Sequence, residues 1–451
     1  MANLSSFITA ILSVTLVLGI MIFVHEWGHF MAAKLAGVRV EVFSFGFGPR
    51  LFGVKRGDTD YRLSALPFGG YVRMSGDNPI EERTGADYEF LSKPRWVRVL
   101  IACAGPAMNL LLAFFIFWGI FWIVGTPAED YLRLPPQVAA VAQDSSVPSS
   151  TSASGIVVGD QVVAVNGVKT PTWEKVYTQV KDDQPGDSVA ITVLRNGSEQ
   201  TFKGQMPAPP ATIESLFGYP LLPPFVGEVG IGTPADRAGL RDGDKIITMD
   251  GTPIITWGQL VDRIRHSDGK PIHFVIQRAG ENQTMPIDIA PVQGMGVDGN
   301  TIWQVGVLPK VKTDYERQAI FPAARIAGLQ TALGIKQIGT VLGGLFTGKV
   351  KIRELQSVVG IARESGRAAK RGPLDLIFFM AVISLNLGLL NLLPIPILDG
   401  GHVLLLTIEG ILRRDLSITV KERFVQVGLV FLLGISAFVI YSDIFKLVQS
   451  H

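Results

Sequence analysis

The sequence has a single cysteine, Cys103, and few charged residues. No intrachain disulfide is therefore possible, and cysteine usage does not indicate a redox compartment. Charged residues make up 18% of the 451 positions, and their formal net charge is only +2, so we expect no nucleic acid partner. Apolar residues make up 47%. This balance indicates a membrane protein with soluble parts.

The beginning of the chain also lacks positive charge, because no lysine or arginine precedes Lys34. A cleavable signal peptide starts with positive charge and ends at a small-residue cleavage site. The apolar run of residues 7–33 instead contains histidines and an acid near its end. It is long enough to cross a hydrocarbon core of about 30 Å. We therefore expect it to remain as the first membrane helix.

Three further apolar runs have the length of membrane helices, namely residues 96–124, 374–393 and 425–441. The short loop after the first helix is rich in lysine and arginine, which places it in the cytoplasm by the positive-inside rule. We expect four spanning helices with both termini outside the cytoplasm. Short strands are expected at residues 38–45, 61–66 and 71–74 of the loop, separated by glycine and proline.

The first helix contains the pattern His-Glu-x-x-His at residues 25–29. Residues four apart lie on one face of a helix, so His25 and His29 can bind the same ion. Zinc hydrolases use this pattern, with the acid, here Glu26, taking a proton from the attacking water. Ionisable side chains at membrane depth are costly and usually functional. We therefore favour a zinc site over chance polar residues on a helix.

The third apolar run leads into Pro394 and Pro396, which end the helix at membrane depth. Asp399 follows, and we predict it to be the third zinc ligand, with His402 as a weaker rival. Asn391 either supports the transition state or packs between helices. Asn109, on the second membrane helix, could hydrogen-bond a partner helix or the surroundings of the active site, but its spacing favours packing between helices alone.

The long polar segment between the second and third membrane helices contains a repeat. Gly155 to Asp160, an Asn-Gly pair and Thr172-Trp173 recur as Gly239 to Asp244, an Asp-Gly pair and Thr256-Trp257. This pattern resembles PDZ domains, which bind peptides at a sheet edge. We expect peptide binding near Gly239 and Leu240 of the second copy. The low-complexity stretch 145–154 makes the first copy less typical. Apolar spacing in residues 314–346 predicts a further helix.

The His25 to His29 motif, Gly105-Pro106-x-x-Asn109, the PDZ-like repeats and the segment Asn391 to Gly400 occur in an order that resembles bacterial site-2 proteases. The resemblance covers nearly the whole chain. It implies a zinc endopeptidase of the bacterial inner membrane, with zinc bound by His25, His29 and Asp399 and with Glu26 as the base. Implied partners are the lipid bilayer, single-pass membrane substrates such as a trimmed anti-sigma factor or signal-peptide remnants, and an upstream site-1 protease.

The fold class that we expect is a multi-pass α-helical membrane protein with four spans, a β-hairpin region and two extracytoplasmic PDZ-like α+β domains. The expected segments are 1–33 (first membrane helix), 34–95 (cytoplasmic-side β-hairpin region), 96–126 (second membrane helix), 127–217 and 218–295 (PDZ-like domains), 296–373 (extracytoplasmic helical region), 374–393 (third membrane helix), 394–424 (Asp399 segment and cytoplasmic loop) and 425–451 (fourth membrane helix and C-terminus). The alternatives are a membrane-anchored PDZ scaffold or chaperone with a vestigial metal site, and a zinc transporter.

Overall fold

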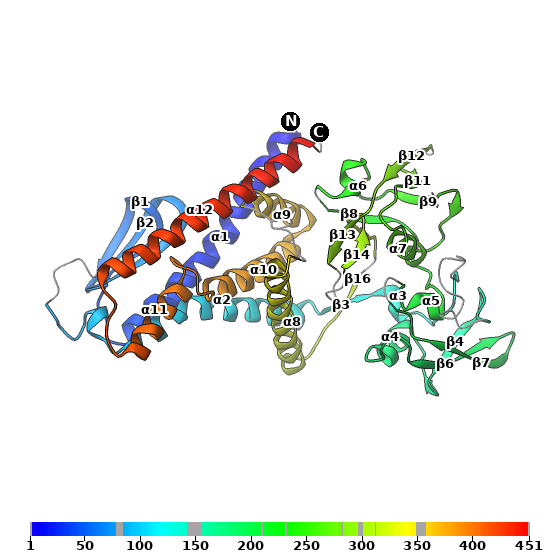
Figure 1. The fold of residues 1–451 in the computed structure, drawn as a ribbon, viewed down its shortest axis with the longest axis horizontal. Coiled ribbons are helices and arrows are strands. Elements are labelled where there is room, and N and C mark those ends of the chain that lie inside the picture. The colour runs from blue at the N-terminus through cyan, green and yellow to red at the C-terminus, as the bar shows by residue number, and fades with distance from the viewer. Residues whose placement is uncertain are drawn as a thin grey trace. The chain divides into compact units, whose positions relative to one another are not determined.

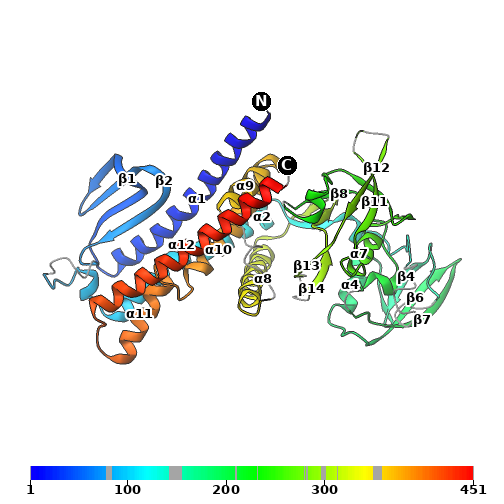
Figure 2. The same ribbon diagram turned by 45° about the horizontal axis from the view of Figure 1, so that its top comes forward.

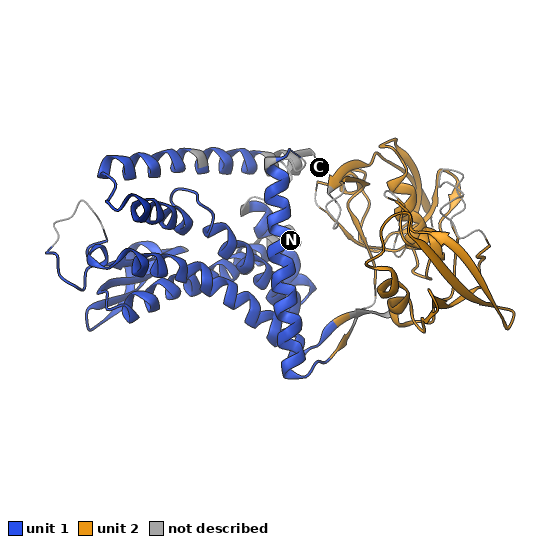
Figure 3. Ribbon diagram, turned by 60° about the horizontal axis from the view of Figure 1, so that its bottom comes forward, with its two compact units in different colours: residues 1–126, 317–444 blue, residues 127–316, 445–451 orange. Residues whose placement is uncertain are grey.

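The computed structural model describes residues 2–77, 84–141, 155–208, 211–230, 232–278, 280, 283–295, 301–311, 313–348 and 358–449. The chain forms two compact units, coloured separately in Figure 3. Residues 1–126 and 317–444 make up the first, which we name the helical unit. Residues 127–316 and 445–451 make up the second, which we name the repeat unit. The low-complexity stretch 145–154 lies outside the described residues.

The helical unit contains seven of the described α-helices (Figure 1). These are α1 (Ala2–Leu35), α2 (Arg95–Ile123), α8 (Ile320–Phe346), α9 (Val358–Arg371), α10 (Pro373–Asn391), α11 (Asp399–Leu412) and α12 (Ile418–Gln449). Four described stretches are long and apolar enough to cross a membrane, namely Ile8–Leu35, Arg95–Ile123, Pro373–Asn391 and Ile418–Tyr441. The four predicted spans are confirmed, although the fourth begins at Ile418 instead of Val425 because the polar turn before it is also helical.

Helix α2 is the centre of the helical unit, where it packs against α1, α8, α10 and α11. Its apolar face joins buried alanines of α8 and α10 in one core. On the α1 side, a Cβ atom at Gly28 would collide with the backbone carbonyl of Ala104. Small residues permit such close helix approach, and here they bring the backbones of α1 and α2 together beside the histidines.

The predicted β-hairpin region forms one antiparallel pair, β1 (Val40–Arg56) and β2 (Thr59–Met74). We predicted short strands broken at Gly46, but β1 continues through this residue with shifts of register. Gly46 has a φ of +90°, and a Cβ there would meet the Leu66 carbonyl, so glycine permits the bulge. Figures 1 and 2 both show the pair beside α1, which it contacts through β1 and β2.

The N-terminal half of β1 pairs on both sides. Phe43 lies opposite Tyr61 on one side and Val72 on the other. The segment Gly70–Met74 is therefore outermost, because its other edge pairs with no strand among the described residues. A short 3-10 helix, η1 (Phe90–Ser92), then leads into α2.

The helix predicted from residue 314 starts later. Residues Thr313–Glu316 form strand β16, which pairs with β3 (Thr126–Glu129), and α8 begins only at Ile320. The prediction was wrong here because pairing with a strand far away in the sequence overrides the local helical spacing. The two paired strands carry the chain between the helical and repeat units.

The repeat unit contains two four-stranded sheets of the same order, β5-β4-β6-β7 and β10-β9-β11-β12. The first copy consists of β4 (Gln161–Val165), β5 (Val168–Lys169), α4 (Trp173–Val180), β6 (Ser188–Arg195) and β7 (Ser198–Gln205). The second consists of β9 (Lys245–Met249), β10 (Thr252–Pro253), α7 (Trp257–Arg265), β11 (Ile272–Gln277) and β12 (Thr284–Ile289). The remaining elements are α3 (Asp130–Arg133), α5 (Glu214–Phe217), β8 (Val226–Val229), α6 (Pro234–Arg237), β13 (Val292–Met295), β14 (Thr301–Gln304) and β15 (Val307–Pro309).

The repeated residues have the same structural roles in both copies. Asn166 and Asp250 have positive φ angles of 50° and 49°, as their turns before glycine require. Thr172 and Thr256 cap the N-termini of α4 and α7 with their side chains. The tryptophan that follows each threonine is buried in its own core. The predicted pair of PDZ-like folds is confirmed.

Candidate metal centre and its cavity

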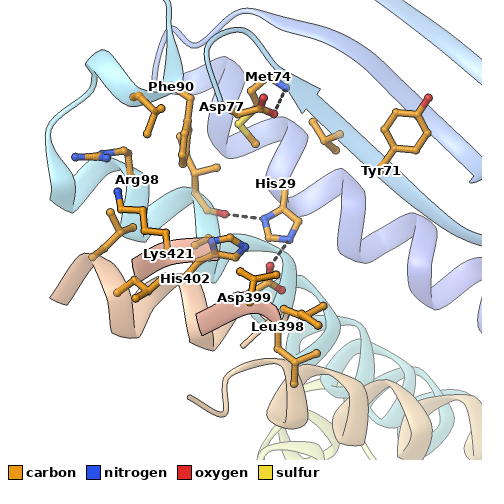
Figure 4. Close-up of a pocket in the computed structure, with 18 of the residues that line it drawn as sticks. His29, Tyr71, Met74, Asp77, Phe90, Arg98, Leu398, Asp399, His402 and Lys421 are labelled. Carbon is orange, nitrogen blue, oxygen red and sulfur yellow. Dashed lines mark hydrogen bonds and ion pairs between the residues drawn. The ribbon is translucent and has the colours of Figure 1, made fainter. Parts of the chain in front are cut away.

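The structure brings His25, His29 and Asp399 together although they lie at opposite ends of the sequence. The Nε2 atoms of the two histidines, one turn apart on α1, are 3.3 Å from each other. The Asp399 Oδ2 atom lies 3.1 Å from His25 Nε2, and its Oδ1 atom lies 3.4 Å from His29 Nε2. Figure 4 shows the His29 ring directed at the Asp399 carboxylate. All three ligand atoms lie within 4.8 Å of one another.

Asp399 reaches the histidines because the backbone unwinds between α10 and α11. Ile397 adopts a φ of +82°, and Asp399 is the first residue of α11. A Cβ on Gly400 would collide with backbone carbonyls of the unwound segment, and one on Gly401 would collide with the Ile395 carbonyl. Glycines at both positions therefore let α11 start immediately against this segment, with the carboxylate facing α1.

The three side chains fit a zinc ion. Tetrahedral zinc with bonds of about 2.05 Å separates its ligand atoms by about 3.3 Å, close to the distances seen here. His25 and His29 are only 8% and 9% exposed. Among the described residues, no lysine or arginine forms an ion pair with Asp399, so the cluster contains no cation of its own. Two imidazoles and one carboxylate match a catalytic zinc site that keeps a fourth position for water.

Groups of helix α2 contact the Nδ1 atoms of both imidazoles. The His29 Nδ1 atom lies 2.8 Å from the Ile101 carbonyl oxygen. The side-chain nitrogen of Asn109 lies 3.2 Å from His25 Nδ1, and Asn109 is fully buried. Our prediction that Asn109 only packs between helices was wrong, because its side chain contacts a zinc-site histidine. The available signal was its place four residues after Gly105, which itself lies against the His29 ring.

The cluster opens into a cavity of about 890 Å³. Glu26 lines this cavity beside the histidines but is outside the group of ligand atoms, as expected for a base. His402 also lines the cavity and is outside that group. The Asn391 side-chain nitrogen lies 3.5 Å from His25 Nε2, so this amide faces the cavity from α10.

The cavity has two further walls. One is the outer strand segment Gly70–Met74, whose Gly70 lies against the Glu26 side chain. The other contains Arg98, Glu409 and Lys421, in which the Lys421 ammonium lies 2.6 Å from the buried Glu409 carboxylate. These walls extend the cavity beyond the metal cluster and give it polar groups away from the zinc ligands.

The two residues predicted to bind peptide in the second repeat, Gly239 and Leu240, remain a prediction. Leu240 is buried in the core, and the Gly239 carbonyl accepts a hydrogen bond from Arg278. A separate cavity of about 440 Å³ lies between α7 and β15, and neither residue lines it. Trp257, Leu260 and Ile264 of α7 do line it.

Comparison with known proteins agrees with this geometry. Residues 13–435 match peptidase family M50. The chain is 32% identical to the regulator of sigma-E protease RseP of Escherichia coli, over 98% of this chain and 100% of that protein. It is 31% identical to the regulator of sigma E protease of Salmonella typhimurium, over 99% of each chain.

The name of a third relative includes the metal. A protein of Neisseria meningitidis, whose name presents it as a candidate zinc metalloprotease, is 32% identical over 99% of this chain and 100% of its own. The four apolar helices, the PDZ-like repeats and the cluster of two histidines with an aspartate are all present. The chain therefore belongs to peptidase family M50 and is a multi-pass membrane zinc metalloprotease.

Proposed function

We propose that this protein is an endopeptidase that cleaves the membrane-spanning segments of single-pass membrane proteins. The observation that carries the proposal is a single cavity lined by Glu26, by the cluster of His25, His29 and Asp399, and by the segment Gly70–Met74, whose outer edge pairs with no strand among the described residues. This combination places hydrolytic groups beside a surface able to hold an extended peptide.

In this proposal, His25, His29 and Asp399 hold zinc, which polarises the scissile carbonyl and activates water when it is bound. Glu26 accepts the proton of the attacking water and then delivers it to the departing amine. Its position supports this role, because it faces the cavity without joining the ligand atoms. The Asn391 amide faces the same space and can donate to the substrate carbonyl oxygen as negative charge develops there.

Peptide bonds inside an intact helix are shielded by the helix's own hydrogen bonds, so the substrate has to unwind before cleavage. An extended substrate added to the Gly70–Met74 edge would exchange its helical hydrogen bonds for strand pairing. Tyr71 and Val72 line the cavity along this edge. The substrate would then lie extended between the sheet and the metal cluster.

Proline substitution tests the strand pairing. Neighbouring strand residues direct their N–H groups to opposite edges, so either Val72→Pro or Arg73→Pro removes a donor from the free edge. Whichever variant loses its outward N–H group should cleave a membrane reporter substrate about tenfold more slowly, because one hydrogen bond to the substrate is lost. Its zinc content should be unchanged. Val54→Pro, in the distant arm of β1, is the matched control and should retain cleavage. Wild-type cleavage by both test variants would refute the pairing.

The substrate class proposed is a membrane-bound anti-sigma factor already trimmed by an upstream site-1 protease, together with signal-peptide remnants. It rests on the full-length similarity to proteins named as regulators of sigma E. We also propose an inner-membrane location, with the PDZ-like pair in the periplasm and the metal centre near the cytoplasmic side. The lysines and arginines of the loop between α1 and α2 support this orientation.

In this scheme the PDZ-like pair excludes substrates whose outer domain is still attached. Deletion of residues 137–290 should then permit cleavage of untrimmed substrate. If the shortened protease still discriminates between trimmed and untrimmed substrate, the repeats do not act as the filter. Loss of Asp399 in the same shortened chain should stop both reactions, which shows whether the cleavage comes from the metal centre.

A further inference from the structure

One face of α2 presents two hydrogen-bonding groups to the zinc-site histidines. Ile101 and Asn109 are eight residues apart, which is about 12 Å or slightly over two helical turns. The Ile101 carbonyl lies 2.8 Å from His29 Nδ1, and the Asn109 amide lies 3.2 Å from His25 Nδ1. The Nδ1 atom of each imidazole therefore faces a different group of α2, while both Nε2 atoms face Asp399.

The tautomer of each ring follows from these contacts. A neutral imidazole that offers Nε2 to a metal carries its proton on Nδ1, which must find an acceptor. For His29 the acceptor is the Ile101 carbonyl oxygen. For His25 the group within reach is the Asn109 amide, but the amide nitrogen, a donor, is drawn nearer to Nδ1.

The Oδ1 atom of the Asn109 amide favours the orientation in which oxygen, not nitrogen, lies nearest His25. This Oδ1 atom is buried and has no hydrogen-bond partner as drawn. An unsatisfied buried acceptor costs about 1–3 kcal/mol. The oxygen and nitrogen of an amide have nearly the same shape, so a half-turn of the amide exchanges them without new contacts. That half-turn gives Oδ1 the Nδ1 proton of His25 to accept, and it turns the amide N–H groups toward the position that offers Oδ1 no donor.

We propose that Asn109 is a positioning residue whose Oδ1 accepts the Nδ1 proton of His25 and thereby holds Nε2 toward the zinc site. This inference rests on the proposed ligand role of His25. Asn109 is fully buried, so the packing around it restrains the amide. Its backbone carbonyl separately accepts a hydrogen bond of 2.9 Å from Ser384, a contact that does not involve the amide. Asn391 differs because its amide approaches Nε2 from the cavity side.

Zinc affinity tests the inference without relying on cleavage. In the purified full chain, competition with a chelator should show zinc bound about 10–100-fold more weakly in Asn109→Ala, the usual effect of losing a partner behind a metal ligand. Asn109→Asp retains an acceptor oxygen and should restore most of the affinity. Ser384→Ala removes the hydrogen bond to the Asn109 backbone but leaves the amide, so it is the matched structural control and should bind zinc as the wild type does.

The outcomes separate this inference from the proposed function. If wild-type protein binds one zinc and His25→Ala loses it, while Asn109→Ala binds as tightly as the wild type, the positioning role is wrong and the zinc site stands. Equal weakening by Asn109→Ala and Ser384→Ala, or no recovery in Asn109→Asp, would also overturn the role. If wild-type protein binds no zinc, the proposed ligand set itself fails.

Discussion

Two acids of the repeat unit, Asp160 and Asp244, differ from Asp399 of the helical unit in their partners. In the repeat unit, Asp160 and Asp244 are almost fully buried, and each forms an ion pair with an arginine, Arg195 or Arg278. The same arginines also donate to the carbonyls of Gly155 and Gly239. Each acid therefore belongs to a completed structural bridge, repeated in both copies.

Asp399 in the helical unit has no such cation. It faces two imidazoles, and among the described residues it forms no ion pair with a lysine or arginine. A partly buried carboxylate without a cation is costly, and a divalent ion would remove that cost. The comparison teaches that Asp160 and Asp244 each have an arginine of their own, as Glu409 of the helical unit has Lys421, whereas the place beside Asp399 is reserved for a metal.

The largest expected effect follows from removing the unpaired acid. Asp399→Ala leaves two imidazoles without the carboxylate, so the purified protein should lose its zinc. Cleavage of a membrane reporter should fall by at least about 10³-fold, since loss of one member of a catalytic group removes most of its rate enhancement. Zinc analysis and cleavage measured on the same sample check this. Full zinc content in the variant would show that zinc binding does not need Asp399, and the contrast with Asp160 and Asp244 would fail.

A smaller effect is expected from removing a structural cation. Arg278→Ala leaves Asp244 buried without its partner, which should destabilise the repeat unit by about 3 kcal/mol. Pulse proteolysis of the full chain measures this loss, and zinc content should stay at the wild-type level. The exposed Lys270 provides the control, because Lys270→Ala removes a positive charge from the same repeat without leaving an acid unpaired. Equal stability of the two variants would show that the bridge is not structural.

The smallest expected effect is a loss of stability of the repeat unit at low pH. Hydrogen bonds from Arg195 hold the pKa of Asp160 below its usual value, despite burial. The folded state therefore binds this proton less readily than the unfolded state, so stability is present above the unfolded pKa of about 3.9 and is lost as the pH falls below it. Protease resistance of residues 127–316 in the full chain should decline from about pH 4 downward, and Asp160→Asn should decline less steeply. Identical slopes would contradict the pairing.

Local patterns predicted much of this site. The spacing of His25 and His29 follows directly from helix geometry, and Pro394 with Pro396 marks the helix break that precedes Asp399. Apolar length predicted all four spans, and the Gly-Asp and Thr-Trp positions predicted the repeat. These features depend on neighbouring residues, which is why the sequence was sufficient.

Features that depend on distant segments were not predictable in this way. Whether Asn109 packs or contacts His25 depends on how closely α1 and α2 approach, which Gly28 and Gly105 permit but do not reveal by themselves. Residues 313–316 form a strand only because β3 is available to pair with them. The free edge at Gly70–Met74 likewise exists because β1 pairs on both sides, a topology that short strand patterns do not contain.

The most direct test of the central claim compares wild-type protein with Glu26→Gln. Both should contain one zinc per chain, because Glu26 lies outside the ligand cluster, and only the wild type should cleave a reporter membrane segment. The account would be contradicted if Glu26→Gln cleaved at the wild-type rate, or if neither protein bound zinc.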